Sequence, residues 1–348
     1  MTEERNKMPE YYRKFIINSI LLATLLVTAA LSPIQGQSIK TSTAQKPQAP
    51  QPDIAGLTHL GIAAQKAGNP TQAIAYFQQA LNLSRNVADR ASEARALYNL
   101  GSIYLMTSQR KLALEHLQEA LNLSRKIGDR VDEGVTLSAL GSFYKNANEP
   151  IQALNFYRQA LAIHRQERDV EAGALTLNRI ANILSEGGDK AQALIYYGET
   201  LALARQLNNK SLLSATLHNI GGVYYQLGNF SRAAAQFQEA LKINRSVGDV
   251  SNEAETLNGL GAVYYSTGDD EQALSFYQEA LRLQRKILDL AGQATTLTNM
   301  ANVYSRQSDY QRAIQLLRDA ASIFEKIGDS PRAKRNRFQV EQLTKRRK

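Results

Sequence analysis

The sequence repeats with a period of 40 residues, and this period limits what the chain can fold into more than any other feature. Its clearest mark is Leu, Ile or Met followed by Gly or Ala, found at Leu60-Gly61, Leu100-Gly101, Leu140-Gly141, Ile180-Ala181, Ile220-Gly221, Leu260-Gly261 and Met300-Ala301. A second mark is an alanine thirteen residues later, found at Ala73, Ala113, Ala153, Ala193, Ala233, Ala273 and Ala313. No insertion or deletion interrupts the seven cycles. A fixed period of this length indicates stacked supersecondary units, none of which can bury its apolar face alone.

Each cycle has the pattern of two helices. In the second cycle, residues 94–106 place apolar or small side chains at i, i+3, i+4 and i+7, which makes one helix face from Leu97, Leu100, Gly101 and Tyr104. A turn at Ser108-Gln109 follows, and the next helix carries its own apolar face. Gly128-Asp129 ends that helix, because glycine readily takes the left-handed cap conformation. We therefore predict an all-α fold.

These residues resemble the tetratricopeptide repeat, in the form of about 40 residues found in kinesin light chains and many bacterial arrays. The Leu-Gly-x-x-Tyr signature stands at Leu100-Gly101-Ser102-Ile103-Tyr104 and at Leu260-Gly261-Ala262-Val263-Tyr264, and its later Ala, aromatic and Ala positions stand at Ala153, Tyr157 and Ala160. Single positions depart from the signature at Ala64, Ala181, Leu184 and Ala301. The resemblance implies a right-handed α-solenoid of antiparallel helix pairs, with seven repeats in residues 54–330.

The segment after the last repeat is basic, and it has the pattern of a capping helix. Residues 331–348 carry eight Lys and Arg side chains against one Glu, so most of the chain's net charge of +9 lies there. A helix at 332–344 would cover the last apolar face with Phe338, Val340 and Leu343. The final residues, Lys345, Arg346, Arg347 and Lys348, could contact an anionic surface or could only keep the end soluble.

The N-terminal segment has the pattern of an export signal. Arg13 and Lys14 precede an apolar run without charges from Phe15 to Leu31. Residues 1–36 are predicted to be a signal peptide or an uncleaved membrane anchor, since the run has about the minimum length that spans a bilayer. Residues 37–53 are rich in Pro and Gln and predict an extended linker. Both a signal peptide and an anchor would place the repeats outside the cytoplasm, in the periplasm, in the medium or anchored to the membrane.

Composition excludes several kinds of site. The chain has no cysteine, which excludes disulfides, thiolate nucleophiles and zinc–thiolate centres, and which is typical of a bacterial envelope protein among exported ones. Its repeats are nearly neutral, whereas a nucleic-acid groove needs a basic stripe. The sequence has no HExxH spacing and no phosphate-binding glycine loop. We expect no enzyme, no cofactor, no metal and no nucleic-acid partner.

The first helix of each cycle is expected to line a concave surface, and the positions beside its core face are rich in Asn. The candidate residues are Arg95, Tyr98, Asn99, Asn178, Arg179, Asn182, His218, Asn219, Asn258, Asn299 and Asn302. We expect this face to be exposed. Each carboxamide offers a donor and an acceptor, which match the N–H and C=O of an extended peptide. The alternative is that these Asn are solvated or pair with each other between repeats. Ala139 and Gly259 break the series, so the groove would not be uniform.

Capture of a peptide on this face is what the resemblance implies, and it gives the predicted function. The chain would be a scaffold or adaptor of the bacterial cell envelope that binds a peptide or protein. The alternative is a non-catalytic regulatory subunit, or a membrane-linked assembly factor, for a separate partner enzyme or complex. One further pattern, an Arg near the end of six second helices, predicts a pair with the helix C-terminus or with a loop Asp; these are Arg85, Arg125, Arg165, Arg205, Arg245 and Arg285.

Overall fold

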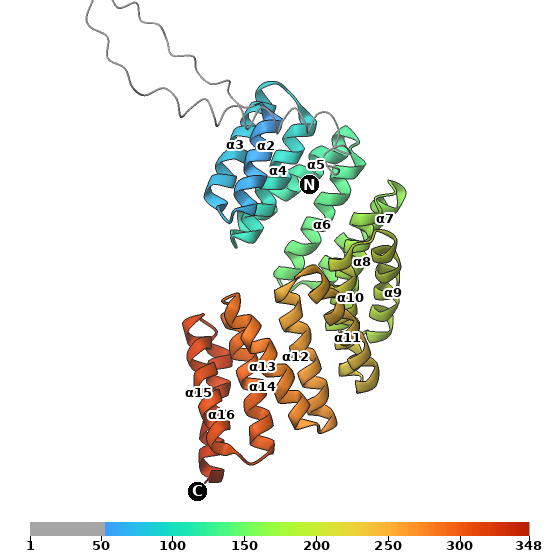
Figure 1. Ribbon diagram of the computed structural model, residues 1–348. Helices are drawn as coiled ribbons and strands as arrows, with labels where there is room; N and C mark the ends of the chain where they lie inside the picture. Colours follow the sequence, from blue (N-terminus) through green and yellow to red (C-terminus); the bar gives the residue numbers. More distant parts are fainter. Residues whose placement is uncertain (1–52, 348) are drawn as a thin grey trace, which may run out of the picture. The chain divides into compact units, whose positions relative to one another are not determined.

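The computed structural model describes residues 53–347, which form fifteen α-helices and no strand within that range (Figure 1). The all-α prediction and the number of helices per cycle are confirmed. The helices are α2 (Ile54–Lys66), α3 (Pro70–Asn86), α4 (Arg90–Met106), α5 (Arg110–Ile127), α6 (Arg130–Asn146), α7 (Pro150–Gln166), α8 (Val170–Glu186), α9 (Lys190–Gln206), α10 (Lys210–Gln226), α11 (Phe230–Val247), α12 (Val250–Thr267), α13 (Asp270–Lys286), α14 (Leu290–Arg306), α15 (Tyr310–Lys326) and α16 (Ser330–Arg347).

Even-numbered helices form an inner layer and odd-numbered helices an outer layer. We call α2, α4, α6, α8, α10, α12 and α14 the A helices and the helix after each of them a B helix. Every helix packs against the helices that precede and follow it in the chain. Each A helix from α2 to α12 also contacts the next A helix, whereas successive B helices meet through the ends of long side chains, such as Arg85 of α3 and Glu119 of α5 at 2.7 Å. The A helices therefore converge on the concave side, as expected.

Short turns recur every 20 residues and have the same design. A residue in each turn has a positive φ, and in half of the turns it is glycine, such as Gly128 at 73° and Gly268 at 88°. Except at Gln109 and Glu149, the side chain of the residue after it caps the next helix: Asp89, for example, accepts a hydrogen bond from the Ser92 backbone N–H at 3.1 Å. A carboxylate or carboxamide in this position binds the unpaired N–H groups of the first helical turn. The turns thereby fix where each helix begins.

A contact between a small residue and a large side chain holds the two helices of each repeat together. If Gly61 carried a Cβ, that atom would lie 2.4 Å from the Phe77 ring. The same close approach is found in four other repeats, in the pairs Gly101–Leu117, Gly141–Tyr157, Gly221–Phe237 and Gly261–Tyr277. Ala181 and Ala301 replace glycine in the other two repeats, where they share a core with Tyr197 and Leu317. The Leu-Gly mark of the sequence is therefore the site where A and B helices touch.

Helix α16 takes the place of an eighth A helix and covers the end of the array. Leu343 is buried and Val340 packs beside it, as predicted, but Phe338 is 60% exposed and does not cover the last repeat. The helix is rotated so that Ala333 and Asn336 face the array instead, and the Asn336 carboxamide donates to Thr298 Oγ1 at 2.9 Å. Its basic end is exposed at Lys345 and Arg346.

Two of the sequence predictions lie outside the described residues. The export signal or anchor at 1–36 and nearly all of the linker at 37–53 precede residue 53, so both stay predictions. Among the helices within residues 53–347, none is long and apolar enough to cross a membrane.

Two neighbouring glycines of α10 give a test of the A–B contact. A Cβ on Gly221 would lie 2.9 Å from the Phe237 ring, whereas a Cβ on Gly222 would have no atom within 4 Å. We expect Gly221→Ala to lower the free energy of unfolding by about 1–3 kcal/mol through overpacking. Gly222→Ala should raise it by about 0.5–1 kcal/mol, because alanine is the better helix former. Urea unfolding followed by circular dichroism would measure both, and stabilisation by both substitutions would contradict the packing described.

Candidate peptide-binding surface

All of the predicted site residues lie on A helices, but most of them are less exposed than expected. Arg95 and Arg179 are exposed. The others are half-buried, namely Tyr98, Asn99, Asn178, Asn182, His218, Asn219, Asn258, Asn299 and Asn302. The expectation of an exposed face was wrong because successive A helices approach each other closely on the concave side, so each covers part of the next.

Several carboxamides of the series hold one repeat to the next. Asn219 Nδ2 donates to Asn182 Oδ1 at 3.0 Å, and the same oxygen accepts from the Tyr197 hydroxyl at 2.5 Å. Asn258 Nδ2 donates to Thr296 Oγ1, one repeat further on, at 2.7 Å. Pairing between repeats, the alternative interpretation of the Asn series, therefore accounts for these residues. They shape the concave surface and have part of their hydrogen-bonding capacity occupied.

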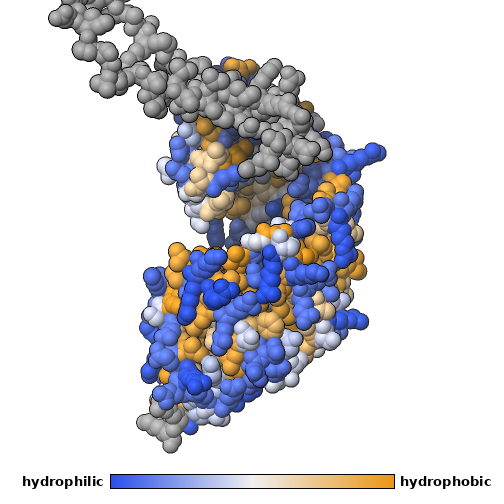
Figure 2. Space-filling view, in the orientation of Figure 1, coloured by the Kyte–Doolittle hydropathy of each residue, from blue (hydrophilic) through white to orange (hydrophobic). Residues whose placement is uncertain are grey.

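One hollow on the concave side spans three successive A helices, α4, α6 and α8. On the face shown in Figure 2, hydrophilic residues lie among the hydrophobic ones. This hollow, the inner cavity, has a volume of about 380 Å³. It is lined by Tyr98, Ser102, Leu105, Met106, Val135, Ser138, Ala139, Ser142, His164, Ala172, Leu175, Thr176 and Arg179.

A second hollow, the polar cavity, lies beside it between α8 and α10. Its volume is about 230 Å³, and its lining is rich in carboxamides and other polar groups. Arg179 of the inner cavity and Asn182 of the polar cavity lie one helical turn apart on α8. The residues that line the polar cavity are Asn182, Ser185, Glu186, Tyr197, His218, Asn219, Gly222, Val223 and Gln226.

The structure thus brings some predicted residues together and leaves others apart. Tyr98 and Arg179 line the inner cavity, and the set Asn182, His218 and Asn219 lines the polar cavity. Arg95 pairs with Asp132 at 2.9 Å on the neighbouring A helix. Asn302 lines a separate hollow at the C-terminal end of the array. The remaining four residues, Asn99, Asn178, Asn258 and Asn299, line none of these cavities.

The floor of the inner cavity consists of buried polar residues that the sequence analysis missed. His164 is 2% exposed, and its Nε2 lies 3.3 Å from Ser138 Oγ, which in turn lies 3.3 Å from Thr176 Oγ1. Burial, with a smaller effect of the Arg179 charge, lowers the pKa of His164 below its ordinary value although Asp169 acts in the opposite direction. The imidazole is therefore neutral near pH 7. The residue equivalent to His164 is buried in every repeat. A histidine at this core position was therefore the feature of the sequence that could have indicated a buried polar group.

The hollow itself follows from a departure that the sequence did show. Ala139 interrupts the Asn series, and its small side chain leaves space between Tyr98 and Arg179. At the other interruption, Gly259, a Cβ would lie 2.8 Å from the Phe237 ring, so this glycine serves packing instead. No cluster of three or more His, Asp or Glu side chains suited to a metal ion occurs in the part of the chain that the structure describes.

Comparison with known proteins identifies the family. The tetratricopeptide repeat family matches residues 53–126, 109–166, 132–206, 173–246, 212–286 and 252–326, which together cover most of the chain. The chain belongs to the tetratricopeptide repeat family. The resemblance in the Leu-Gly-x-x-Tyr positions is thereby confirmed. A search of curated proteins finds no significant match.

Solved structures share the fold of this tetratricopeptide array at low identity. BtubC (BKLC) from P. vanneervenii is 21% identical, with a TM-score of 0.55 over 66% of this chain and 92% of that protein. A Rap protein complexed with Competence and Sporulation Factor is 16% identical, with a TM-score of 0.54 over 84% and 98%. The quorum sensor NprR from B. thuringiensis is 16% identical, with a TM-score of 0.56 over 84% and 88%. These similarities establish the helical solenoid and no more.

Two Asn residues at equivalent positions of the array test whether the hydrogen bonds between repeats contribute to stability, because one makes such a bond and the other does not. Asn219→Ala removes the donor to Asn182 and should lower the free energy of unfolding by about 0.5–1.5 kcal/mol. Asn299→Ala removes no hydrogen bond that the described residues form, and it should change stability by less than about 0.5 kcal/mol. Thermal melts of the two variants measure the difference, and equal melting temperatures would show that the Asn219–Asn182 pair contributes nothing.

Proposed function

We propose that this tetratricopeptide protein is an adaptor that binds an extended segment of a partner protein along α4, α6, α8 and α10. The observation that carries the proposal is the placement of the inner and polar cavities side by side along α8. Successive A helices lie ~8–10 Å apart, and an extended peptide advances ~3.3 Å per residue. About every third residue of a bound segment would therefore meet the next repeat.

The two cavities favour different parts of such a segment. The inner cavity offers apolar contacts through Val135, Leu175 and Leu105, so it suits an aliphatic or aromatic side chain. Arg179 at its edge is exposed and can donate to a backbone carbonyl or to an acidic side chain. The polar cavity presents His218 and Gln226, which can bind backbone or polar groups. A matching segment would carry one bulky apolar residue followed by polar ones.

We place this adaptor in the bacterial cell envelope on the basis of its sequence. Arg13 and Lys14 followed by an apolar run form the pattern of an export segment, and the chain has no cysteine. The alternative, a non-catalytic regulatory or assembly subunit, uses the same surface and differs only in the client that it binds. The Rap structure, solved as a complex with Competence and Sporulation Factor, provides a precedent for partner binding by this fold.

Filling the inner cavity tests the proposal. Ala139→Arg would place a long charged side chain where the segment should lie, and we expect at least a tenfold loss of the partner recovered from envelope extract. Ala162→Arg makes the same change on the exposed surface of α7, outside the cavities, and should recover the partner as the unmodified protein does. Both variants should melt at nearly the same temperature as the original protein.

Two results would contradict this account. Equal recovery by both Arg variants would exclude the concave face as the binding surface. Recovery of the partner from cytosolic extract but not from envelope extract would leave the adaptor role intact and refute the envelope location.

A further inference from the structure

Ion pairs recur on the outer side of the array, between the end of a B helix and the next A helix. Each joins the Arg Nε of one repeat to a buried or half-buried Glu of the following repeat, and not to a loop Asp or the helix end alone, as the sequence suggested. Burial raises the pKa of Glu93, but hydrogen bonds from Arg85 and Arg90 outweigh it and hold the pKa below its ordinary value, so the carboxylate is ionised there. The pairs are Arg85–Glu93 at 2.8 Å, Arg125–Glu133 at 2.9 Å and Arg245–Glu253 at 2.8 Å.

Between the third and fourth repeats the arginine, Arg165 of α7, is present but the glutamate is missing from α8. Gly173 stands where Glu93, Glu133 and Glu253 stand in their repeats. Arg165 keeps its other partner, because its Nη2 lies 2.7 Å from Glu199 Oε2. No carboxylate of the described residues takes the place of the missing one at its Nε. A Cβ on Gly173 would meet only His164 Cβ, at 3.9 Å, so the space beside it is open.

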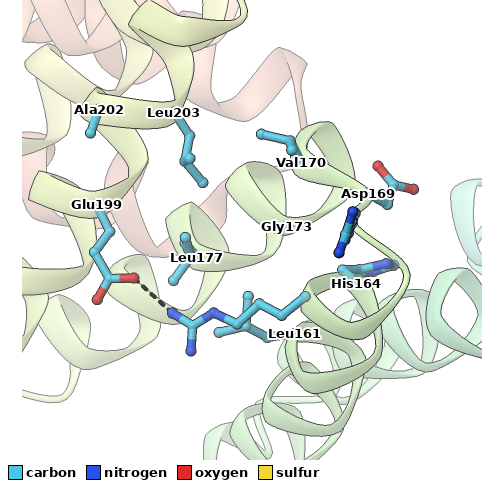
Figure 3. A pocket seen from close by; sticks show the side chains of 11 residues that line it. Leu161, His164, Asp169, Val170, Gly173, Leu177, Glu199, Ala202 and Leu203 are labelled. Atoms are coloured by element: carbon cyan, nitrogen blue, oxygen red, sulfur yellow. Dashed lines mark hydrogen bonds and ion pairs between the residues drawn. The ribbon is translucent and has the colours of Figure 1, made fainter.

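The missing side chain leaves a hollow with a volume of about 520 Å³. We call it the outer cavity, and it lies between the B helices α7 and α9 over the start of α8. Figure 3 shows Leu161, Val170, Leu177 and Leu203 arranged around the space beside Gly173. The residues that line it are Leu161, His164, Arg165, Arg168, Asp169, Val170, Gly173, Leu177, Glu199, Ala202 and Leu203.

In other repeats that lack the glutamate, another side chain stands at its position. In the fifth repeat Leu213 takes the position and packs with Ala204 and Leu212. In the seventh, Gln293 takes it and donates a hydrogen bond to the Gln284 carbonyl at 3.2 Å. Only the fourth repeat of the described array leaves the position without a side chain. The cavity there is lined by two cations, Arg165 and Arg168, and by two carboxylates, Asp169 and Glu199, of which Glu199 is already paired with Arg165 Nη2.

We propose that the outer cavity binds a small amphipathic carboxylate, whose charged end replaces the missing glutamate at Arg165 Nε. Its apolar body would lie against Leu161, Leu177 and Leu203. Charge-assisted bonds between guanidinium and carboxylate are among the strongest hydrogen bonds in proteins. The volume of the outer cavity is within the ~300–1,000 Å³ typical of small-molecule sites. A mainly apolar lining with few polar groups is also typical of such sites. The same chemistry is present in a free aliphatic acid and in the C-terminus of a peptide that ends in an apolar residue.

Calorimetry on the full chain with octanoate tests the site, with octanol and octylamine as probes that lack the carboxylate. We expect octanoate to bind at least tenfold more tightly than either. Gly173→Glu should abolish octanoate binding and keep or raise the melting temperature, because Glu93, Glu133 and Glu253 already occupy this position in folded repeats. Gly198→Glu, an exposed change on α9 that lines none of the cavities described above, should bind octanoate as the unmodified chain does.

The outcomes that overturn the proposal are equally specific. Octanoate that does not bind at millimolar concentration, that binds no better than octanol, or that binds Gly173→Glu with unchanged affinity would each refute it. Short peptides that end in Leu, as free acid and as amide, distinguish the sources by competition with octanoate. If only the free-acid peptide displaces octanoate, the site is supported and also binds peptide C-termini. If neither peptide displaces octanoate, the site is specific for free aliphatic acids. Equal displacement by both peptides would refute the role of the carboxylate.

Discussion

The contact between a small residue of an A helix and a large side chain of its B helix is the interaction on which the rest of the array depends. It recurs once in each repeat, most closely at Gly61–Phe77, where glycine alone allows the ring to approach the helix backbone. Because the contact stands at the same position of every repeat, each pair of helices packs in the same way and presents the same face to the next. The concave and outer surfaces are consequences of that regular spacing.

Both candidate sites lie where the fourth repeat or its neighbour departs from the pattern of the others. Ala139 leaves the inner cavity open on the concave side, and Gly173 leaves the outer cavity open between two B helices. His164 lines both, since its ring lies in the core between them. A solenoid is held together by contacts between neighbours, so it can lose one side chain at one repeat without losing its fold. Such local losses provide space for ligands.

The period made the helices, the turns and the array predictable, because each is encoded within 40 consecutive residues. Contacts between repeats were harder to predict. Asn219 was expected to face solvent, but it donates to Asn182 in the preceding repeat, and the partner depends on how closely two A helices approach. Phe338 was placed in the core by its helical spacing, although the rotation of α16 exposes it. The small residues behind the cavities, Ala139 and Gly173, are visible in the sequence, but whether a small residue leaves a hollow depends on how the neighbouring helices pack.

The central claim, that the concave face binds the partner, is tested most directly by photocrosslinking in cells that produce the protein. A photoreactive residue would replace Ala139 in the inner cavity or, in a separate variant, Ala162 on the outside of α7. The account predicts a defined adduct from position 139 and none from position 162. The same adduct from both positions, or an adduct from position 162 alone, would contradict it.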